Sequence, residues 1–276
     1  METGKPSRTA TAVARARAQH QLADEPRVFT DPFAVRVVGD AALGEGEFDE
    51  GLDPDFLRRR RLWVAARSRF ADDTVAGAVA SGCRQVVVLG AGLDTSALRN
   101  TRPDVRFFEV DHPDTQRWKR HRLAEAGIAV PDTLTFVPVD FESATLAEGL
   151  AAVDFDRARA TTFVMLGVAA YLTLPSLTAT WRFLAGQGGG AVLVMDYLHP
   201  VAGAAATALD ERARRVAAAG EPWLSAFTAD ELRDALVDAG FSAVEDRSAA
   251  EVLGHYLDRT VTDSLGSGHL VRATAT

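Results

Sequence analysis

The sequence has little of what an extracellular or membrane-spanning protein needs. Cys83 is its only cysteine, so no disulfide can form within the chain, and a reducing compartment is expected. No run of apolar residues approaches the ~20 that span a bilayer. The first residues, Met1 to Pro6, lead into no apolar stretch of the kind that a secretory signal needs. We therefore expect a soluble, cytoplasmic protein with no membrane partner.

Positive charge is also scarce. The chain has 30 Lys and Arg against 38 Asp and Glu, a formal net charge of −8, whereas a general nucleic-acid binder needs a surplus of cations to neutralise phosphates. No set of His, Asp and Glu has the spacing of metal ligands, so no metal is expected. A homo-oligomer is compatible with the sequence, but nothing in the sequence indicates one.

Apolar residues, in contrast, are plentiful. They make up 47% of the 276 residues, and charged residues make up 25%, a composition that supports a folded core and gives no sign of disorder. No repeat and no Pro/Ser-rich linker divides the chain. We expect one structural domain with an N-terminal helical cap over residues 1–80. A core over 81–276 follows, with a lid insertion near 201–225.

Helical spacing characterises the N-terminal part. Residues 7–21 are rich in Ala and Arg, contain no Gly or Pro, and begin at Ser7, a good N-cap residue. Pro32 stands at a plausible first helical position ahead of an apolar stretch. From Pro54 to about Ala80 apolar residues recur at helical intervals. These patterns predict helices ahead of the first strand.

After Arg84 short β-branched runs alternate with helical stretches. The first run, Val86 to Leu89, stops at Gly90, as expected of a strand buried on both faces of a parallel sheet. Similar runs lie at 105–110, 134–139, 162–166 and 191–195, with helical stretches at 115–126, 143–152, 176–184, 203–218 and 228–239. This order predicts right-handed βαβ units and a Rossmann-like, doubly wound α/β sheet with helices on both faces. The segments 241–245 and 269–273 are expected to close the sheet.

The end of the first strand is the first place to look for a ligand, because open α/β sheets bind ligands beyond the carboxyl ends of their strands. Gly90 allows a tight turn there, and Gly92 lets a ligand approach the backbone. Thr95 stands where a dinucleotide fingerprint has its third small residue, which weakens the pyrophosphate interpretation. A structural turn without a ligand is the alternative.

Acidic residues follow the second and third strands. Asp111 comes roughly 20 residues after the glycines, where a carboxylate meets ribose hydroxyls, and it is preferred to Glu109 because it lies past the apolar run. The alternative is that Asp111 caps the helix near Pro113. Asp140 and Phe141 suit an adenine, as acceptor for its amine and as a stacking ring; helix capping by Asp140 is again the alternative. Three neighbouring strand ends thus describe an adenosine slot.

These motifs resemble the leucine carboxyl methyltransferase family, in its bacterial branch of S-adenosylmethionine (SAM)-dependent methyltransferases. The resemblance covers roughly residues 7–200, and several unusual motifs occur in the family's order. The matching segments are SRTA at 7–10, ARA at 16–18, DPFA at 31–34, AARSRFADD at 65–73, VVVLGAGLDT at 86–95, FEVDHP at 108–113 with Gln116 and Lys119, VDF at 139–141, GV at 167–168 and YLT at 171–173.

The resemblance implies a class I SAM-dependent methyltransferase fold of seven strands, mostly parallel, with the last one antiparallel. It also implies that Arg67 pairs with the methionine carboxylate of SAM and that Gly90 belongs to the cofactor loop. Asp111 is implied as the ribose ligand, and Asp140 with Phe141 as the adenine contacts. A guanidinium fork suits a carboxylate on chemical grounds as well.

One position departs from the family. A glutamate usually follows the fourth strand, whereas this chain has Leu166 before Gly167 and Val168. In relatives that acid lies at the methionine end of the cofactor, so the leucine removes a carboxylate that could balance a positive charge there. Two alternatives to methyl transfer therefore stay open. One is a non-methylating reaction on the same fold, such as a cyclisation or rearrangement, and the other is a non-catalytic SAM-binding protein.

The expected reaction is O-methylation of a small-molecule acceptor such as a secondary metabolite. A carboxylate, with a pKa of about 4, is ionised at pH 7 and needs no base, whereas a phenol or hydroxyl usually needs one. No catalytic residue is identified; the candidates are Tyr171, Tyr197 and His199, and packing or loop roles are the alternative. The arginine run at 58–61 is either a solvated helix face or an attractant for an acidic substrate.

Overall fold

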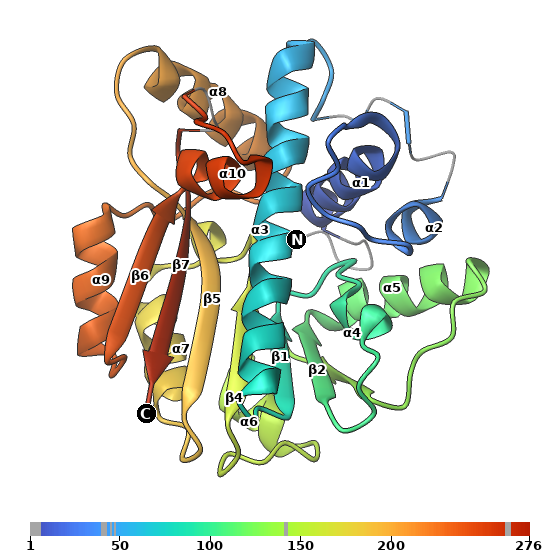
Figure 1. The fold of residues 1–276 in the computed structure, drawn as a ribbon, viewed down its shortest axis with the longest axis vertical. Coiled ribbons are helices and arrows are strands. Elements are labelled where there is room, and N and C mark those ends of the chain that lie inside the picture. The colour runs from blue at the N-terminus through green and yellow to red at the C-terminus, as the bar shows by residue number, and fades with distance from the viewer. Residues whose placement is uncertain (1–6, 40–42, 45, 47, 141–142, 263–265) are drawn as a thin grey trace.

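The computed structural model describes residues 7–39, 43–44, 46, 48–140, 143–262 and 266–276. Its centre is a seven-stranded sheet in the order β3-β2-β1-β4-β5-β7-β6 (Figure 1). Five strands pair in parallel: β1 (Gln85–Leu89), β2 (Arg106–Asp111), β3 (Leu134–Pro138), β4 (Thr161–Met165) and β5 (Ala191–Leu198). β7 (Gly268–Ala275) runs antiparallel between β5 and β6 (Ala243–Ser248). The predicted doubly wound, mostly parallel sheet is confirmed.

Helices cover both faces of the sheet. In Figure 1 the long α3 (Pro54–Ala80) runs lengthwise in front of the sheet, and α10 (Ala249–Leu257) lies beside it at the upper ends of β6 and β7. α6 (Leu146–Ala151), α7 (Leu174–Ala185) and α9 (Ala229–Asp238) pack against the other face. Alternate β1 residues serve the two cores, Val87 with α7 and Val86 with α3. Burial on both faces is the reason why the strand reads as a continuous apolar run.

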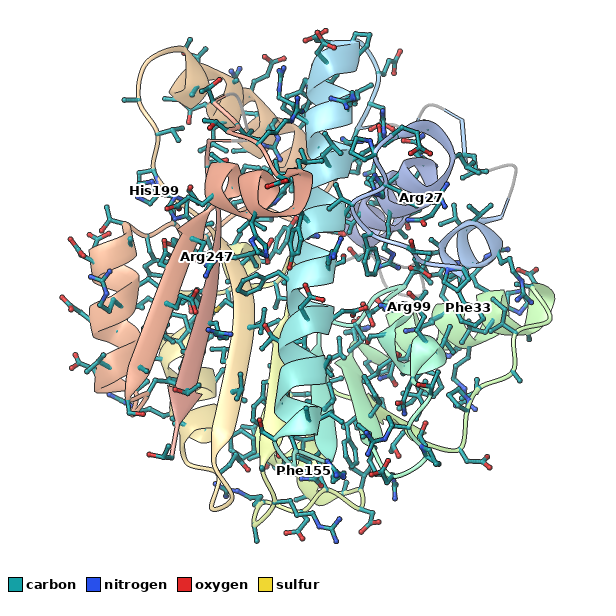
Figure 2. The ribbon with its side chains drawn as sticks, in the orientation of Figure 1. Arg27, Phe33, Arg99, Phe155, His199 and Arg247 are labelled. Atoms are coloured by element: carbon teal, nitrogen blue, oxygen red, sulfur yellow. The ribbon has the colours of Figure 1, made fainter. Side chains whose placement is uncertain are left out.

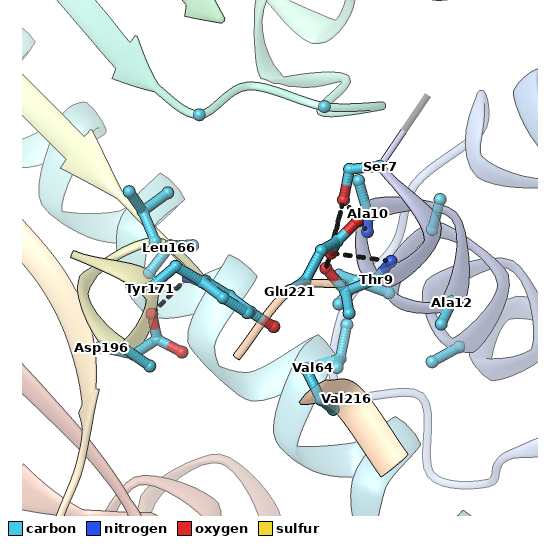
Figure 3. A pocket seen from close by; sticks show the side chains of 18 of the residues that line it. Ser7, Thr9, Ala10, Ala12, Val64, Leu166, Tyr171, Asp196, Val216 and Glu221 are labelled. Atoms are coloured by element: carbon cyan, nitrogen blue, oxygen red, sulfur yellow. Dashed lines mark hydrogen bonds between the residues drawn. The ribbon is translucent and has the colours of Figure 1, made fainter. Parts of the chain in front are cut away.

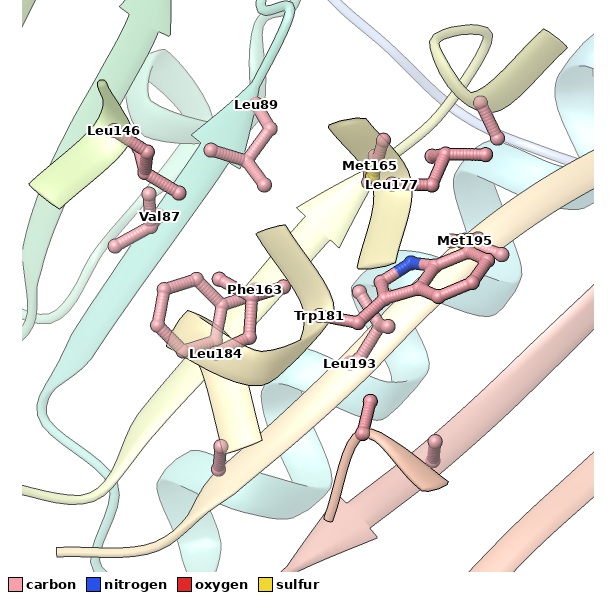
Figure 4. Packing of buried hydrophobic residues seen from close by; sticks show 14 of the residues in the cluster. Val87, Leu89, Leu146, Phe163, Met165, Leu177, Trp181, Leu184, Leu193 and Met195 are labelled. Carbon is pink, nitrogen blue, oxygen red and sulfur yellow. The ribbon is translucent and has the colours of Figure 1, made fainter. Parts of the chain in front are cut away.

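The core beneath α7 is built around Trp181. Its side chain is fully buried among Phe163, Leu184 and Leu193 (Figure 4). Its ring also meets that of Phe227 edge-on, with centroids 6.1 Å apart. An indole buried in this way contributes one of the largest apolar areas that a single side chain can remove from water.

The N-terminal helices pack beside the strand ends. α1 (Arg8–Ala23) begins as predicted after Ser7, whose hydroxyl accepts from the Ala10 N–H at 3.1 Å. The expectation that Pro32 is the first residue of a helix is wrong, because α2 spans Ala34–Val38. The Asp31 carboxylate accepts from the next free N–H groups, those of Phe33 at 3.0 Å and Ala34 at 3.1 Å, and so starts the turn itself.

The remaining helices lie around the upper end of the sheet. α4 (Ser96–Arg99) and α5 (Pro113–Glu125) follow β1 and β2, and a short 3-10 turn (Ala169–Tyr171) follows β4. α8 (Ala204–Ala218) stands beside the N-terminal half of α3, across from α1 and α2 (Figure 1). Among the described residues, no helix combines the length and the apolar character that crossing a membrane requires.

Candidate functional site

A cavity of about 540 Å³ lies at the carboxyl ends of β1, β2, β4 and β5. Its floor includes the glycine loop after β1, Asp111, Leu166 and Asp196. Its walls and roof come from α1, the N-terminal half of α3, α8 and residues 220–224 (Figure 3). This volume is within the range of small-molecule and cofactor sites. The elements expected to form the cap and the lid thus meet around one space.

Both glycines of the loop after β1 have positive φ, +61° at Gly90 and +50° at Gly92, a region that side-chain-bearing residues rarely occupy. A Cβ on Gly90 would stand 2.4 Å from Cγ2 of Val168, so the turn also needs the space. A Cβ on Gly92 would stand 3.2 Å from the Cβ of Ala10. The absence of a side chain at Gly92 therefore makes room for Ala10 of α1, in addition to any room that it leaves for a ligand.

Asp111 is held by the backbone around it. Its Oδ2 accepts from the Gly92 N–H at 2.5 Å and its Oδ1 from the His112 N–H at 2.7 Å. Burial raises the pKa of Asp111, and these two N–H groups oppose the rise. The suggestion that Asp111 caps the next helix is wrong, because the His112 ring accepts from the Asp114 N–H at 3.2 Å and caps α5. Asp111 instead faces the cavity.

The neighbouring acid, Glu109, is buried beneath the loop and pairs with Lys119. The Nζ atom of Lys119 lies 2.5 Å from Oε2 of Glu109 and 2.6 Å from the carbonyl oxygen of Asp94. Burial raises the pKa of Glu109 to about 7, against the opposing effect of the Lys119 charge. Glu109 and Lys119 thus support the glycine loop from below, and Asp111 is the acid that reaches the cavity.

Arg67 and Asp196 form a buried ion pair at the other side of the cavity floor. Arg67 comes from α3, and Asp196 is a buried residue of β5 that also accepts from the Gly167 N–H at 2.5 Å. Gly167 has φ +72°, and a Cβ there would stand 3.3 Å from Nη2 of Arg67. Asp196 did not emerge from the sequence as a site residue. It places a carboxylate beside Leu166, where the family's glutamate is missing.

Thr95 connects the loop to the N-terminal cap. Its hydroxyl donates to Oδ2 of Asp31 at 2.6 Å, and Nε of Arg17 lies 3.1 Å from the same oxygen. Arg17 also donates to the carbonyl oxygen of Leu93. The dinucleotide fingerprint has a small residue at the position of Thr95. The threonine in this chain has a structural role instead, because its hydroxyl helps to hold α1 and α2 over the strand ends.

The expected adenine contacts are less defined. The carbonyl oxygen of Asp140 accepts from the N–H groups of Ser143 at 3.0 Å and Ala144 at 2.8 Å. The Asp140 side chain is not among those that line the cavity, and Phe141 lies outside the described residues. Both assignments stay predictions.

The three candidate catalytic side chains have different surroundings. Tyr171 lines the cavity, and its hydroxyl has no hydrogen-bond partner in the part of the chain that the structure describes. Tyr197 borders the cavity, but its hydroxyl donates to Asp246 at 2.6 Å, and burial with that charge holds its pKa well above the ordinary value. His199 stacks on His269 with centroids 4.4 Å apart and does not line the cavity. Figure 2 shows it across α3 from Arg27.

Comparison with solved structures identifies the fold. Magnesium protoporphyrin IX methyltransferase (ChlM) from Synechocystis PCC 6803, solved with bound SAH (S-adenosylhomocysteine), matches with a TM-score of 0.52 at 16% identity. The match covers 87% of this chain and 92% of that chain. At this identity the likeness concerns the fold, which is that of class I SAM-dependent methyltransferases.

Sequence comparison identifies the family. The profile of leucine carboxyl methyltransferases matches residues 10–185. "Putative S-adenosyl-L-methionine-dependent methyltransferase YktD" from Bacillus subtilis is 28% identical in an alignment 282 positions long, which covers 91% of this chain and 91% of that protein. A protein of the same description from Mycolicibacterium gilvum is 34% identical in an alignment 221 positions long, which covers 75% of this chain and 71% of that protein. The chain belongs to the leucine carboxyl methyltransferase family and is a SAM-dependent methyltransferase.

Proposed function

We propose that this protein acts in the cytoplasm and transfers a methyl group to an oxygen atom of a small molecule, a carboxylate or a phenol. The observation that carries the proposal is the cavity of about 540 Å³, which is enclosed by cap and lid elements directly above the strand ends of a methyltransferase fold. Such a roofed space suits a small acceptor, and walls on several sides exclude the water that competes with it.

The donor and acceptor groups on the cavity floor fit SAM. Arg67 would bind the methionine carboxylate through the guanidinium donors that Asp196 does not use, and Asp111 would accept from the ribose hydroxyls through its remaining lone pairs. Asp140 and Phe141 are proposed for the adenine. When bound, SAM supplies an electrophilic methyl group on a sulfonium. The chain's own residues contribute orientation of that group and of the acceptor, which can supply much of the acceleration.

Asp196 bears on the choice between methyl transfer and its alternatives. The case for a non-methylating or non-catalytic protein rests on Leu166, which removes a carboxylate from the methionine end. Asp196 lies beside Gly167 and pairs with Arg67, so it provides a negative charge in the same place from a different strand. We propose that Asp196 balances the positive charge at this end of the cofactor and thereby supports methyl transfer.

The acceptor atom is inferred from the side chains in the cavity. No histidine is among the described residues that line it, and Tyr171 is the one candidate whose hydroxyl is available there. A carboxylate acceptor needs no general base at pH 7, because it is already ionised. This favours a carboxylate over a phenol.

Incubation with methyl-labelled SAM and a panel of small carboxylic acids and phenols tests the proposal. We expect label to enter at least one acid as a base-labile ester, with release of an equal amount of SAH. Product analysis by mass spectrometry separates this result from a rearrangement, which would leave the methyl group on SAM. Absence of labelled product across the panel, from protein that binds SAH, would count against the proposal.

The ribose assignment is tested by Asp111→Ala. Loss of charge-assisted hydrogen bonds to the ribose is expected to weaken SAH binding by at least about 1.5 kcal/mol, roughly tenfold, in calorimetric titration. Asp132→Ala, at an exposed position before β3, is the matched control and should leave the affinity unchanged. Equal affinities of the two variants would assign the ribose to another acid.

A further inference from the structure

Arg212 lies in an unusual environment on the wall of the cavity. It projects from α8, half-buried, and its Cζ atom stands 5.4 Å from the ring centroid of Phe56 and 5.4 Å from that of Trp223. The first ring comes from α3 and the second from the segment after α8. Aromatic faces hold a guanidinium by cation–π attraction and keep water from it. The structure thus fixes a cation in the cavity without hydrating it fully.

The other arginines that line the cavity each have a carboxylate partner. Arg17 pairs with Asp31, Arg60 with Asp49, Arg67 with Asp196, and Arg215 with Glu211. Arg212 pairs with no carboxylate in the described ranges of the chain. Burial, with the like charge of Arg60 adding to its effect, lowers the pKa of Arg212 to about 10. The side chain therefore remains a cation at pH 7.

Glu221, the carboxylate of the segment after α8, does not pair with Arg212 but bonds to the start of α1. The carboxylate of Glu221 accepts from the Ser7 hydroxyl at 3.0 Å and from the Arg8 N–H at 3.0 Å, and so caps the start of α1 (Figure 3). Carboxylates are stabilising at such helix starts. Glu221 closes the roof between the cap and the lid, and Arg212 is left to face the cavity. A half-buried cation that no carboxylate of the described residues neutralises is a favourable place for a ligand's anion.

The position of Arg212 along the cavity indicates which end of a bound ligand it would contact. Figure 3 shows the Tyr171 ring reaching from the side of Leu166 and Asp196 toward Val216. Arg212 lies one helical turn before Val216 on α8, where residues four apart share a face. Arg212 is therefore in the part of the cavity wall that α8 forms, the lid end, where its charge interacts with Tyr171.

We propose that Arg212 binds a carboxylate on the acceptor at the lid end of the cavity, and that this carboxylate anchors the acceptor and is not the group that is methylated. A guanidinium-bound carboxylate has its charge and lone pairs engaged, which makes it a poor nucleophile. The acceptor is then a hydroxy acid or a dicarboxylic acid with an apolar or aromatic body. This inference rests on the proposed function, because the ligand is a methyl acceptor only if the protein transfers a methyl group. Binding of a carboxylate at Arg212 can nevertheless be measured without turnover.

The test compares acids with their uncharged amides on SAH-loaded protein. The probes are 4-hydroxyphenylacetate and 3-phenylpropanoate with the corresponding amides, titrated by ligand-observed NMR. We expect the wild-type protein to bind each acid about tenfold or more tightly than its amide, as a charge-assisted pair implies. Arg212→Met, which keeps an unbranched side chain between the two rings, should abolish this preference. Arg212→Lys should keep part of it, because it keeps the charge and loses the fork.

Two controls separate the possible results. Arg214→Met, at an exposed position on the same helix, should keep the full preference for acids. SAH affinity, measured for each variant, shows that the protein is folded and loaded. Equal binding of acid and amide to the wild-type protein, or a preference that survives in Arg212→Met, would overturn the inference. A preference that depends on Arg212 without any labelled product in the transfer assay would refute the proposed methylation and leave the anion site standing.

Discussion

Replacing Arg67 with alanine is expected to weaken SAH binding by about 100-fold. The guanidinium would make two charge-assisted hydrogen bonds to the methionine carboxylate, each contributing about 1.5 kcal/mol or more, and about 2.8 kcal/mol corresponds to 100-fold. Alanine also leaves the buried Asp196 carboxylate without the Arg67 guanidinium, and this carboxylate would repel that of the ligand. Calorimetric titration with SAH measures the change.

The control for this variant lies on the same helix. Arg69 is 44% exposed, and its Nε stands 3.8 Å from Asp73, a surface pair of little energetic value. Arg69→Ala should therefore bind SAH as the wild-type protein does. Arg67→Lys should recover only part of the affinity, since a point charge cannot form the bidentate contact. If Arg67→Ala binds SAH normally, the ion pair with Asp196 is a structural contact only.

Much of the fold could be predicted because its signals are local and strong. The strands are short β-branched runs that are buried on both faces, and α3 has its predicted bounds, Pro54–Ala80, because a capping Asp53 and an initial proline mark its start. The start of α2 could not be predicted from Pro32. There the deciding contact is Asp31 with its own backbone and with Thr95, a residue distant in sequence.

The site was predictable where it depends on strand ends and unpredictable where it depends on side-chain direction. Tyr197 and His199 were singled out because they follow the fifth strand. Successive side chains of a strand point to opposite faces, so Asp196 reaches Arg67 while the Tyr197 ring enters the core behind the sheet. Arg212 carries no local signal at all. Its role follows from two aromatic rings, Phe56 and Trp223, that only the folded chain brings together.

The largest effect on stability is expected from Trp181→Ala, at about 3–5 kcal/mol of unfolding free energy. The side chain is 0% exposed, and its Nε1 has no hydrogen-bond partner among the described residues, so apolar packing accounts for its contribution. The cavity left among the β4 and β5 side chains cannot collapse easily, because the strands are fixed by pairing on both sides. Urea denaturation followed by circular dichroism measures the loss.

Leu174→Ala is the control, on the same helix at a position that is 50% exposed, and it should change the unfolding free energy by no more than about 0.5 kcal/mol. Trp181 packs on the face of the sheet opposite to α3 and Arg67. The folded fraction of Trp181→Ala should therefore bind SAH with wild-type affinity, in contrast to Arg67→Ala, which should stay folded and lose affinity. If folded Trp181→Ala also loses SAH affinity, the packing behind the sheet controls the position of the strand ends. SAH binding would then depend on that packing as well as on the side chains that line the cavity.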